Sequence, residues 1–359
     1  MERIHYQSFY HHPFWFRAYL RAHPEKGDNF AFSCVYRGSA LVGVFPTISG
    51  RKSESGAMVA ELPVGDELFM ADCAIADGED GGEIYDVFRN SLSNVTGRPW
   101  DVFRATFMLR DGHLGKAISS RNPLNYTVFA QGRCAEMSIR NYDEAIAGLK
   151  RKFRGNLNNA KNKLERDGDA RFVVERSAIP VRGMFDQFVE LEMAGWKGDP
   201  SRPRDDYTTP SAIGLRESKH SFYTDVIAQF AEAGCAEISQ LWLDDRLIGS
   251  IVSLILNDTC YVLKVAYNEE AGRYSPGHLL IDHAYRRFAR EGRIRRINMI
   301  TAYPWVRGWE PYYRDYVVFR DFNLTLRGVF ACLRSKVGAM RRDYRNARQK
   351  DQIHEPVRK

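Results

Sequence analysis

The sequence of 359 residues lacks the features that mark membrane-spanning, secreted and metal-binding chains. Its longest apolar stretch, Ile248 to Leu256, is far shorter than the ~20 residues that span a bilayer. The N-terminal residues lead into aromatics and histidines instead of an apolar signal-peptide core. The six cysteines include no C-x-x-C pair, so we expect reduced thiols and no zinc site. These absences predict a cytoplasmic protein without a metal centre.

The main body of the chain also lacks an excess of positive charge. The net charge is +7, and residues 327–359 hold ten Lys/Arg against three Asp/Glu, which leaves 42 basic and 42 acidic residues in 1–326. We therefore do not expect the body to bind nucleic acid. A hydrophobic content of 44% excludes a wholly disordered chain, and the length fits about two average domains.

A pair of short strands joined by a polar turn occurs twice, at residues 30–48 and 237–256. A shift of 206 positions aligns the two without gaps, placing Tyr36 on Trp242, Leu41 on Leu247, Val42 on Ile248 and Gly43 on Gly249. This register predicts a duplicated unit, although unrelated hairpins can look alike.

Between the hairpins, apolar residues recur at helical spacing and predict one amphipathic helix. They are Ile146, Leu149, Phe153, Leu157, Ala160 and Leu164. Its basic outer face suits either solvent or a binding partner. Later segments predict helices at 181–195 and 222–233 and strands at 171–174, 260–267 and 297–302. This alternation indicates an α/β (α+β) fold with a mixed sheet.

The segment from Tyr261 to Arg290 combines a strand, a turn and a helix that opens with Ser275-Pro276-Gly277. We expect the Ser275 hydroxyl to cap the helix and Pro276 to occupy its first position. Gly277 permits close approach of a ligand to the backbone. The segment predicts either an anion site at the helix N-terminus or simply a well-capped helix.

The corresponding place in the first half is acidic. A strand expected near 68–75 is followed by Asp77 to Glu83, which contains four acids and no base. Since a phosphate would be repelled there, only the second half is expected to hold a phosphorylated ligand.

The run Tyr274-Ser275-Pro276-Gly277-x-Leu279-Leu280, followed by Gly292, a strand and a tryptophan-containing loop, resembles the GNAT-type acyltransferases. The likeness covers residues 140–312. Within this group, the chain is similar in particular to the bacterial CelD/BcsL-like acetyltransferases. It implies a tandem GNAT-like fold: a degenerate half at 1–135, an acyl-CoA-binding half at 136–326 and a basic tail at 327–359. The chain departs from the family where a Tyr-Lys pair is usual, because it has Trp305-Val306 there.

The resemblance implies acyl transfer from acetyl-CoA or another acyl-CoA to an amine or hydroxyl of a small molecule or saccharide, in exopolysaccharide or cellulose biosynthesis. The expected donor-binding residues are Arg273, Tyr274, Ser275, Pro276, Gly277, His278 and Leu279. The expected acceptor-binding residues are Trp196, Trp305 and Trp309, of which Trp196 could instead pack against its own helix.

Three residues are candidates for the chemistry. Tyr267 could protonate the leaving thiolate or be a core aromatic, while a strand amide near Ala266 or Tyr267 would polarise the thioester carbonyl. Asp282 could act as base or form an ion pair with Arg286 one turn on. Lys264 could meet the donor or acceptor, although we expect it to reach solvent. His278 should be neutral near the helix N-terminus.

The tail has its own apolar stripe, which runs from Leu326 through Phe330, Leu333, Val337 and Met340 to Tyr344 between basic residues. It could dock on the body, attach peripherally to an anionic inner-membrane surface, or contact RNA. Two rival functions are a Fem-type ligase that uses aminoacyl-tRNA and a non-catalytic membrane- or RNA-binding module. The sequence does not fix the oligomeric state.

Overall fold

The computed structural model describes residues 8–52, 56–63, 67, 72–97, 99–119, 126–202 and 209–338. The chain forms two compact units. Unit 1 contains residues 1–5, 25–132 and 315–359, and unit 2 contains residues 6–24 and 133–314. Parallel and antiparallel strand pairs both occur, which confirms the mixed α/β fold.

Unit 2 has the sheet order β6-β11-β10-β9-β8-β7. Its strands are β6 (Tyr126–Ser138, which begins in unit 1), β7 (Ala170–Glu175), β8 (Ala236–Leu243), β9 (Arg246–Leu256), β10 (Thr259–Tyr267) and β11 (Arg296–Asn298). Its helices are α1 (Pro13–Ala22), α4 (Tyr142–Gly148), α5 (Arg151–Asp167), α6 (Ala178–Ala194), α7 (Glu217–Glu232) and α8 (Pro276–Glu291).

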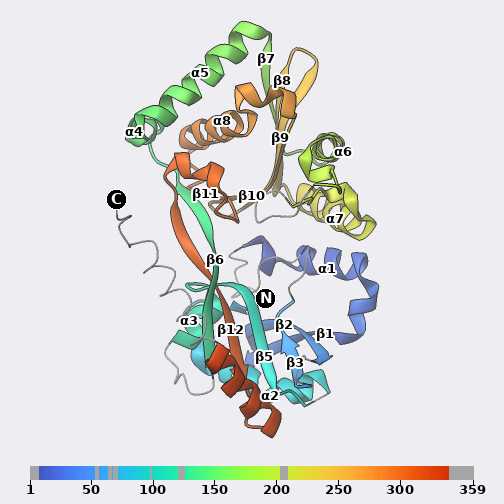
Figure 1. Cartoon of the computed structure of the whole chain (residues 1–359). Helices are drawn as coiled ribbons and strands as arrows, with labels where there is room; N and C mark the ends of the chain where they lie inside the picture. Colours follow the sequence, from blue (N-terminus) through green and yellow to red (C-terminus); the bar gives the residue numbers. More distant parts are fainter. Residues whose placement is uncertain are drawn as a thin grey trace, which may run out of the picture. The chain divides into compact units, whose positions relative to one another are not determined.

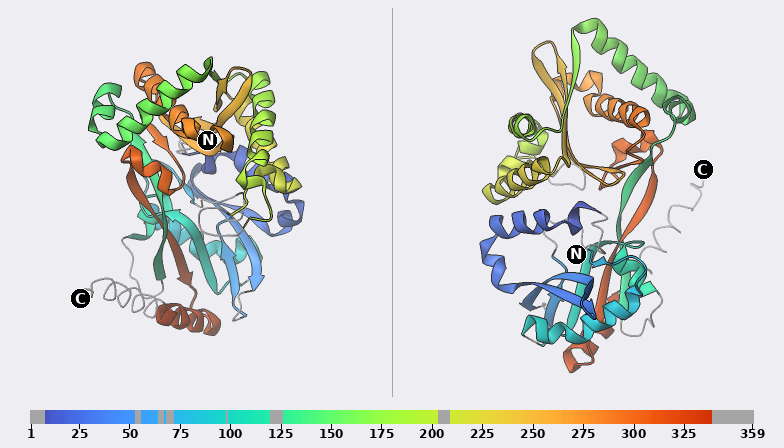
Figure 2. Two further views of the ribbon diagram at one scale, coloured as in Figure 1. Left: turned by 45° about the horizontal axis from the view of Figure 1, so that its top comes forward. Right: turned by 180° about the vertical axis from the view of Figure 1, so that it is seen from behind.

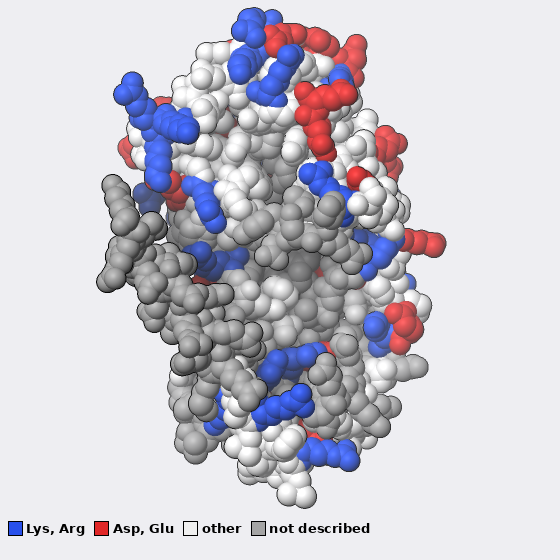
Figure 3. Space-filling model, viewed as in Figure 1, with Lys and Arg blue, Asp and Glu red and all other residues white. Residues whose placement is uncertain are grey.

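The sheet of unit 2 is covered on both faces, by α5 and α8 on one and by α6 and α7 on the other (Figure 1 and Figure 2). Leu157, Ile248, Leu280 and Phe288 belong to the core beneath α5 and α8. The N-terminal segment also belongs to this unit, since α1 packs on α7. On the face in Figure 3, Lys and Arg lie beside Asp and Glu over the upper part of the molecule.

Unit 1 has the order β1-β2-β3-β5-β12, with β4 beside β2. Its elements are β1 (Phe30–Arg37), β2 (Ala40–Lys52), β3 (Met58–Glu61), β4 (Ala74–Ile75), α2 (Gly81–Thr96), β5 (Val102–Leu109), α3 (His113–Ser119) and β12 (Tyr312–Phe322, whose first residues belong to unit 2). Phe45 stacks on Phe88 in its core, with ring centroids 4.1 Å apart. Of the strand expected near 68–75, residues 68–71 lie outside the described part of the chain.

The predicted repeat is confirmed down to an irregularity in the ladder. In β1–β2 the register shifts between Val35 and Tyr36, and in β8–β9 it shifts between Leu241 and Trp242, the positions related by 206 residues. In each half, a helix follows the hairpin, α2 in the first half and α8 in the second. Each of these two helices has 16 residues and ends at a glycine with a left-handed backbone. A Cβ added at Gly43 or Gly249 would lie 2.6 or 2.7 Å from a side chain of α2 or α8. Each glycine therefore lets its helix pack closely on the hairpin.

The last strand of each half pairs in the unit formed mainly by the other half. β6 follows the first-half elements but pairs with β11, while β12 follows the second-half elements but pairs with β5. The expected boundary between residues 135 and 136 falls inside β6.

The long amphipathic helix expected from residue 146 to 164 is two helices. α4 ends at Gly148, Leu149 and Lys150 are extended, and α5 begins at Arg151. The apolar stripe continues across the break because Leu149 is buried in the same core as Leu157. Periodicity alone did not reveal the interruption.

Candidate active site

The N-terminus of α8 differs from the sequence expectation at its first residue. Ser275 has φ 49° and ψ 54°, in the left-handed region, and its hydroxyl makes no capping hydrogen bond. The predicted hydroxyl cap is therefore wrong, because the left-handed backbone does not have the extended conformation of a usual N-cap. Pro276 occupies the first turn, as predicted.

Most of the amides expected to form a diphosphate cradle are already bonded. The amides of His278 and Leu279 donate to the Ser275 carbonyl at 3.0 and 3.2 Å, and the Ser275 amide donates to Gly272. Gly277 keeps its amide without a backbone acceptor in the described part of the chain. A Cβ added there would meet only Val265, at 3.5 Å. The turn thus offers one open amide and the positive end of the helix dipole, a smaller site than expected.

The equivalent helix in unit 1 carries its own anion. Asp80 precedes α2, and its Oδ1 accepts hydrogen bonds from the amides of Gly82 at 2.8 Å and Glu83 at 3.3 Å. This carboxylate occupies the position that a bound phosphate would take. Of the two helices, α8 is therefore the one without a side-chain cap.

An aromatic cluster of Phe153, His278, Trp305 and Trp309 surrounds the start of α8. The Trp309 indole donates to Nδ1 of His278 at 3.1 Å, which places the proton of a neutral imidazole on Nε2. Burial lowers the pKa of His278. The ring centroids of Phe153 and Trp305 lie 5.2 and 5.4 Å from that of His278. The structure thus brings together three of the sequence-predicted site residues.

The contacts of the Arg273 and Tyr274 side chains indicate a structural role. The Tyr274 hydroxyl donates to Asp167 of α5 at 2.9 Å and also receives a hydrogen bond from Arg273, which forms an ion pair with the same carboxylate. These contacts fix the turn before α8 to the end of α5. Leu279 is buried in the core, so its side chain is turned away from any ligand.

β10 has an open edge next to this turn. Among the residues that the structure describes, β11 pairs only with Thr259 to Tyr261, and β10 continues to Tyr267 with β9 as its one strand partner. The Asn268 amide donates to the carbonyl of Ile248, so by the alternation of an antiparallel ladder Val265 and Tyr267 direct their backbone polar groups away from β9. The backbone amide of Tyr267 is therefore at the open edge, while the amide of Ala266 faces β9. Of these two candidates for polarising the thioester carbonyl, only the Tyr267 amide is on the open side.

Two lysines converge on one buried carboxylate beside this edge, and we refer to Glu192, Lys197 and Lys264 as the charged cluster. Lys197 and Lys264 lie 3.6 and 3.5 Å from the same oxygen of Glu192, whose side chain is fully buried. The Lys197 ammonium also donates to the carbonyl of Val265 at 2.6 Å. Burial, opposed in part by Glu192, lowers the pKa of Lys197 to about 8.

Lys264 does not reach solvent, so that expectation is wrong. Only 13% of its side chain is exposed, and its ammonium donates to the carbonyl of Ser211 at 3.0 Å. The ladder shifts register between Val262 and Lys264, so simple alternation along β10 fails at this point.

The remaining candidates make different contacts. Tyr267 is 37% exposed at the end of β10, and is thus not a core aromatic. The Trp196 amide donates to Glu269 at 2.5 Å, just beyond that strand, and its ring lies under Lys197 and Arg202. Asp282 instead accepts from Tyr142 of α4 at 2.5 Å and pairs with Arg286 at 3.6 Å. These contacts fit the ion-pair alternative considered for Asp282.

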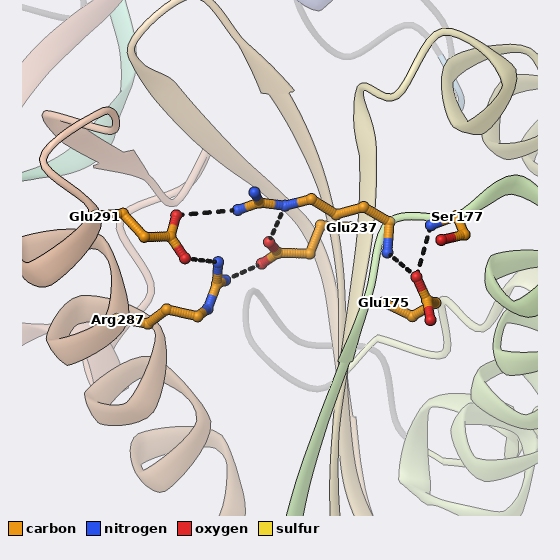
Figure 4. A network of polar contacts seen from close by, with 6 residues as sticks. Glu175, Ser177, Glu237, Arg287 and Glu291 are labelled. Atoms are coloured by element: carbon orange, nitrogen blue, oxygen red, sulfur yellow. Dashed lines mark hydrogen bonds and ion pairs between the residues drawn. The ribbon is translucent and has the colours of Figure 1, made fainter.

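The C-terminal half of α8 takes part in an ionic network around the buried carboxylate of Glu237 (Figure 4). Glu237 of β8, which is 2% exposed, accepts from Arg287 at 2.5 Å and from Arg176 at 2.8 Å. Glu291 pairs with both arginines. The network ties the C-terminal half of α8 to β8 and to the residues just before α6.

Sequence reasoning missed Glu192 and Lys197. Glu192 follows Phe185 and Phe188 at helical spacing, so it lies on the buried stripe of α6. A carboxylate on such a stripe signals a buried charge that needs partners. Lys197 carried no comparable signal, because it lies in the short turn after α6.

Residues 151–314 match the family model described as "Acetyltransferase (GNAT) domain". This part of the chain is therefore similar to a GNAT-superfamily acetyltransferase domain, a match that supports a transferase. No curated protein sequence shows significant similarity to the chain.

Solved structures show the fold of the whole chain. A structure of FemX is 12% identical, covers 90% of this chain and 98% of its own, and has a TM-score of 0.57. L-PGS from Bacillus licheniformis is 13% identical over 90% of this chain and 96% of its own, with a TM-score of 0.53. The C-terminal domain of a putative lysylphosphatidylglycerol synthetase from Agrobacterium fabrum is 10% identical over 90% of both chains, with a TM-score of 0.51. At these identities the likeness extends to the fold alone, which is a tandem GNAT-like arrangement.

Two features are absent from the described residues. They contain no group of three or more His, Cys, Asp or Glu that could hold a metal ion. Within the same ranges, no helix has the length and apolarity required to cross a bilayer.

Proposed function

We propose that the chain transfers an acyl group from acetyl-CoA, or a longer acyl-CoA, to an amine or hydroxyl of a small molecule or saccharide. The observation that carries the proposal is the uncapped N-terminus of α8, which has an open amide at Gly277 beside the open edge of β10. A diphosphate suits the first feature, and the amide-containing arm of CoA suits the second, since a strand edge pairs with extended amides.

The residues along this edge have complementary roles in the proposal. Gly277 and the α8 dipole hold the diphosphate, while the aromatic cluster shapes the turn around it. The Tyr267 amide stabilises charge on the thioester oxygen, and the exposed Tyr267 hydroxyl protonates the thiolate that leaves.

Lys197 is the proton acceptor in this proposal. With a pKa of about 8, a fraction of Lys197 is neutral near neutral pH, and its lone pair is then available for the attacking amine or hydroxyl. Lys264 and Glu192 position it through the contacts of the charged cluster.

The acceptor and the setting depend on the family resemblance alone. A saccharide acceptor, a role in exopolysaccharide or cellulose biosynthesis and a cytoplasmic location remain expectations, and Trp196 and Trp305 are the aromatic rings available for stacking on such an acceptor.

The test compares donor binding by two substitutions at one position. Gly277→Asp places a carboxylate next to the diphosphate and should abolish acetyl-CoA binding in calorimetry. Gly277→Ala is the matched control, because its Cβ has room at 3.5 Å from Val265, and should retain binding. Equal affinity of the wild type and Gly277→Asp would exclude this turn as the donor site.

A second candidate is transfer from an aminoacyl-tRNA donor. It is favoured by the fold likeness to FemX and L-PGS, which are aminoacyl transferases and cover most of this chain. The balanced charge of residues 1–326 favours the CoA donor instead, because tRNA binding relies on phosphate contacts with an excess of basic side chains.

A further inference from the structure

A helix at residues 326–338 docks on unit 1 through its smallest side chains. Ser335 is 8% exposed, and its hydroxyl lies 3.1 Å from that of Thr127. A Cβ added at Gly328 would lie 2.1 Å from the carbonyl of Asn323, just before the helix, and 2.9 Å from the carbonyl of Asp101, so only glycine permits this approach. Ala331 and Cys332 pack against a small buried cluster that includes Phe322. The helix is therefore anchored by a face that carries no large apolar residue.

The opposite face carries the large apolar residues, and they are exposed. Leu326 is 94% exposed, Phe330 and Leu333 are each 60% exposed, Val337 is 47% exposed and Val329 is 44% exposed. We call these five side chains the outer stripe. An amphipathic helix of a globular protein normally buries such a stripe and exposes its polar face. Here the orientation is reversed, so the sequence alternative in which the stripe docks on the body is wrong for these residues.

Basic residues border the outer stripe on both sides. At about 100° per residue, Arg327 and Arg334 project on one side of the stripe and Lys336 on the other. In the sequence, residues 327–359 as a whole hold ten Lys/Arg and three Asp/Glu. Residues 339–359, with the last two members of the predicted stripe, lie outside the described part of the chain.

We propose that the outer stripe is a docking surface for a membrane with anionic lipids, lying in the plane of the headgroups. An apolar strip between basic borders matches the acyl boundary and the negative headgroups of such a surface. A second copy of the chain fits the surface poorly, because a symmetric pairing of two stripes would place Arg327 and Arg334 of one copy close to their equivalents.

The proposal is tested with the full chain and sedimented vesicles of phosphatidylcholine, with and without phosphatidylglycerol. The wild type should bind the anionic vesicles. Phe330→Asp and Leu333→Asp should each weaken binding by about tenfold or more, because each removes an apolar group that the bilayer would bury. Both side chains are exposed, so folding should be unaffected. Ile179→Asp is the control, since Ile179 is an 85% exposed apolar residue on α6, outside the stripe.

A second pair of variants tests the charge. Arg327→Gln and Arg334→Gln should weaken binding to anionic vesicles and reduce its dependence on salt, without affecting the little binding to neutral vesicles. Three results would overturn the proposal. The first is no vesicle binding by the wild type, and the second is equal binding by the wild type and Phe330→Asp. The third is self-association of the wild type that Phe330→Asp abolishes, without any effect of the substitution on vesicle binding. In the first case, vesicle binding that appears only after removal of residues 339–359 would show that those residues, and not a membrane, occupy the outer stripe.

Discussion

Replacing Glu192 with glutamine should destabilise unit 2 more than its small change in shape suggests. Glu192 is the carboxylate that both Lys197 and Lys264 approach in the charged cluster, and its second oxygen accepts from the amide of Ile213 at 2.8 Å. Glutamine can keep the last hydrogen bond but has no charge. The two lysines then remain buried together without this counter-charge.

The expected loss follows from these distances. At an effective dielectric constant of about 20, unit charges 3.5 Å apart attract each other by about 5 kcal/mol. Much of this attraction is offset by desolvation, and removing one partner of a buried pair costs about 3–5 kcal/mol in measured cases. We expect Glu192→Gln to lower the free energy of unfolding by about that amount near neutral pH.

The pH dependence gives the prediction a sign. The folded-state pKa of Lys197, about 8, is already below its ordinary value because of burial, and the loss of Glu192 lowers it further. The unfolded state therefore binds more protons, and stability rises as pH increases from the folded pKa toward the unfolded one. The difference in the free energy of unfolding between the wild type and Glu192→Gln should therefore be smaller at about pH 10 than at about pH 7.

The assay is urea unfolding monitored by tryptophan fluorescence at both pH values. Glu190→Gln, an exposed carboxylate on the same helix, is the matched control and should be within about 0.5 kcal/mol of the wild type. A Glu192→Gln variant as stable as this control, or a deficit that does not change with pH, would refute the interpretation of the cluster.

Two matched pairs test how the two repeat helices begin and pack. Ser275→Ala should leave thermal stability unchanged because its hydroxyl caps nothing, whereas Asp80→Ala should cost about 1 kcal/mol through loss of the α2 cap; equal effects would contradict the assigned caps. Gly249→Ala should cost about 1–3 kcal/mol in urea unfolding, since its Cβ would lie 2.7 Å from Pro276, while Gly277→Ala should be nearly neutral. A tolerated Gly249→Ala would show that α8 can move away from the hairpin.

Local patterns in the sequence were enough to predict the repeat and the start of α8. The hairpins depend on alternation and turn residues close in the chain, so a shift of 206 residues aligned them. The structure adds that both ladders have an irregularity at the corresponding positions. Pro276 fixes the first turn of α8 for an equally local reason. The pairing of β6 with β11 and of β12 with β5 joins segments far apart in sequence, and no local pattern encodes it.

The candidate site was only partly readable for the same reason. His278, Trp305 and Trp309 were selected one by one, and the fold brings them together. The left-handed backbone of Ser275 and the irregularity before Lys264 are conformations of single residues, which residue type alone does not specify. Glu192 was detectable, because its position on the apolar stripe of α6 conflicts with its charge.

The most direct test of the acyl-CoA assignment is a calorimetric titration of the full chain with desulfo-CoA, which lacks the reactive sulfur, and with an aminoacyl-tRNA at matched salt. We expect saturable binding of desulfo-CoA with one site per chain, and only weak tRNA binding that disappears as salt is raised. Absence of heat with desulfo-CoA, together with tight tRNA binding, would contradict the proposed donor.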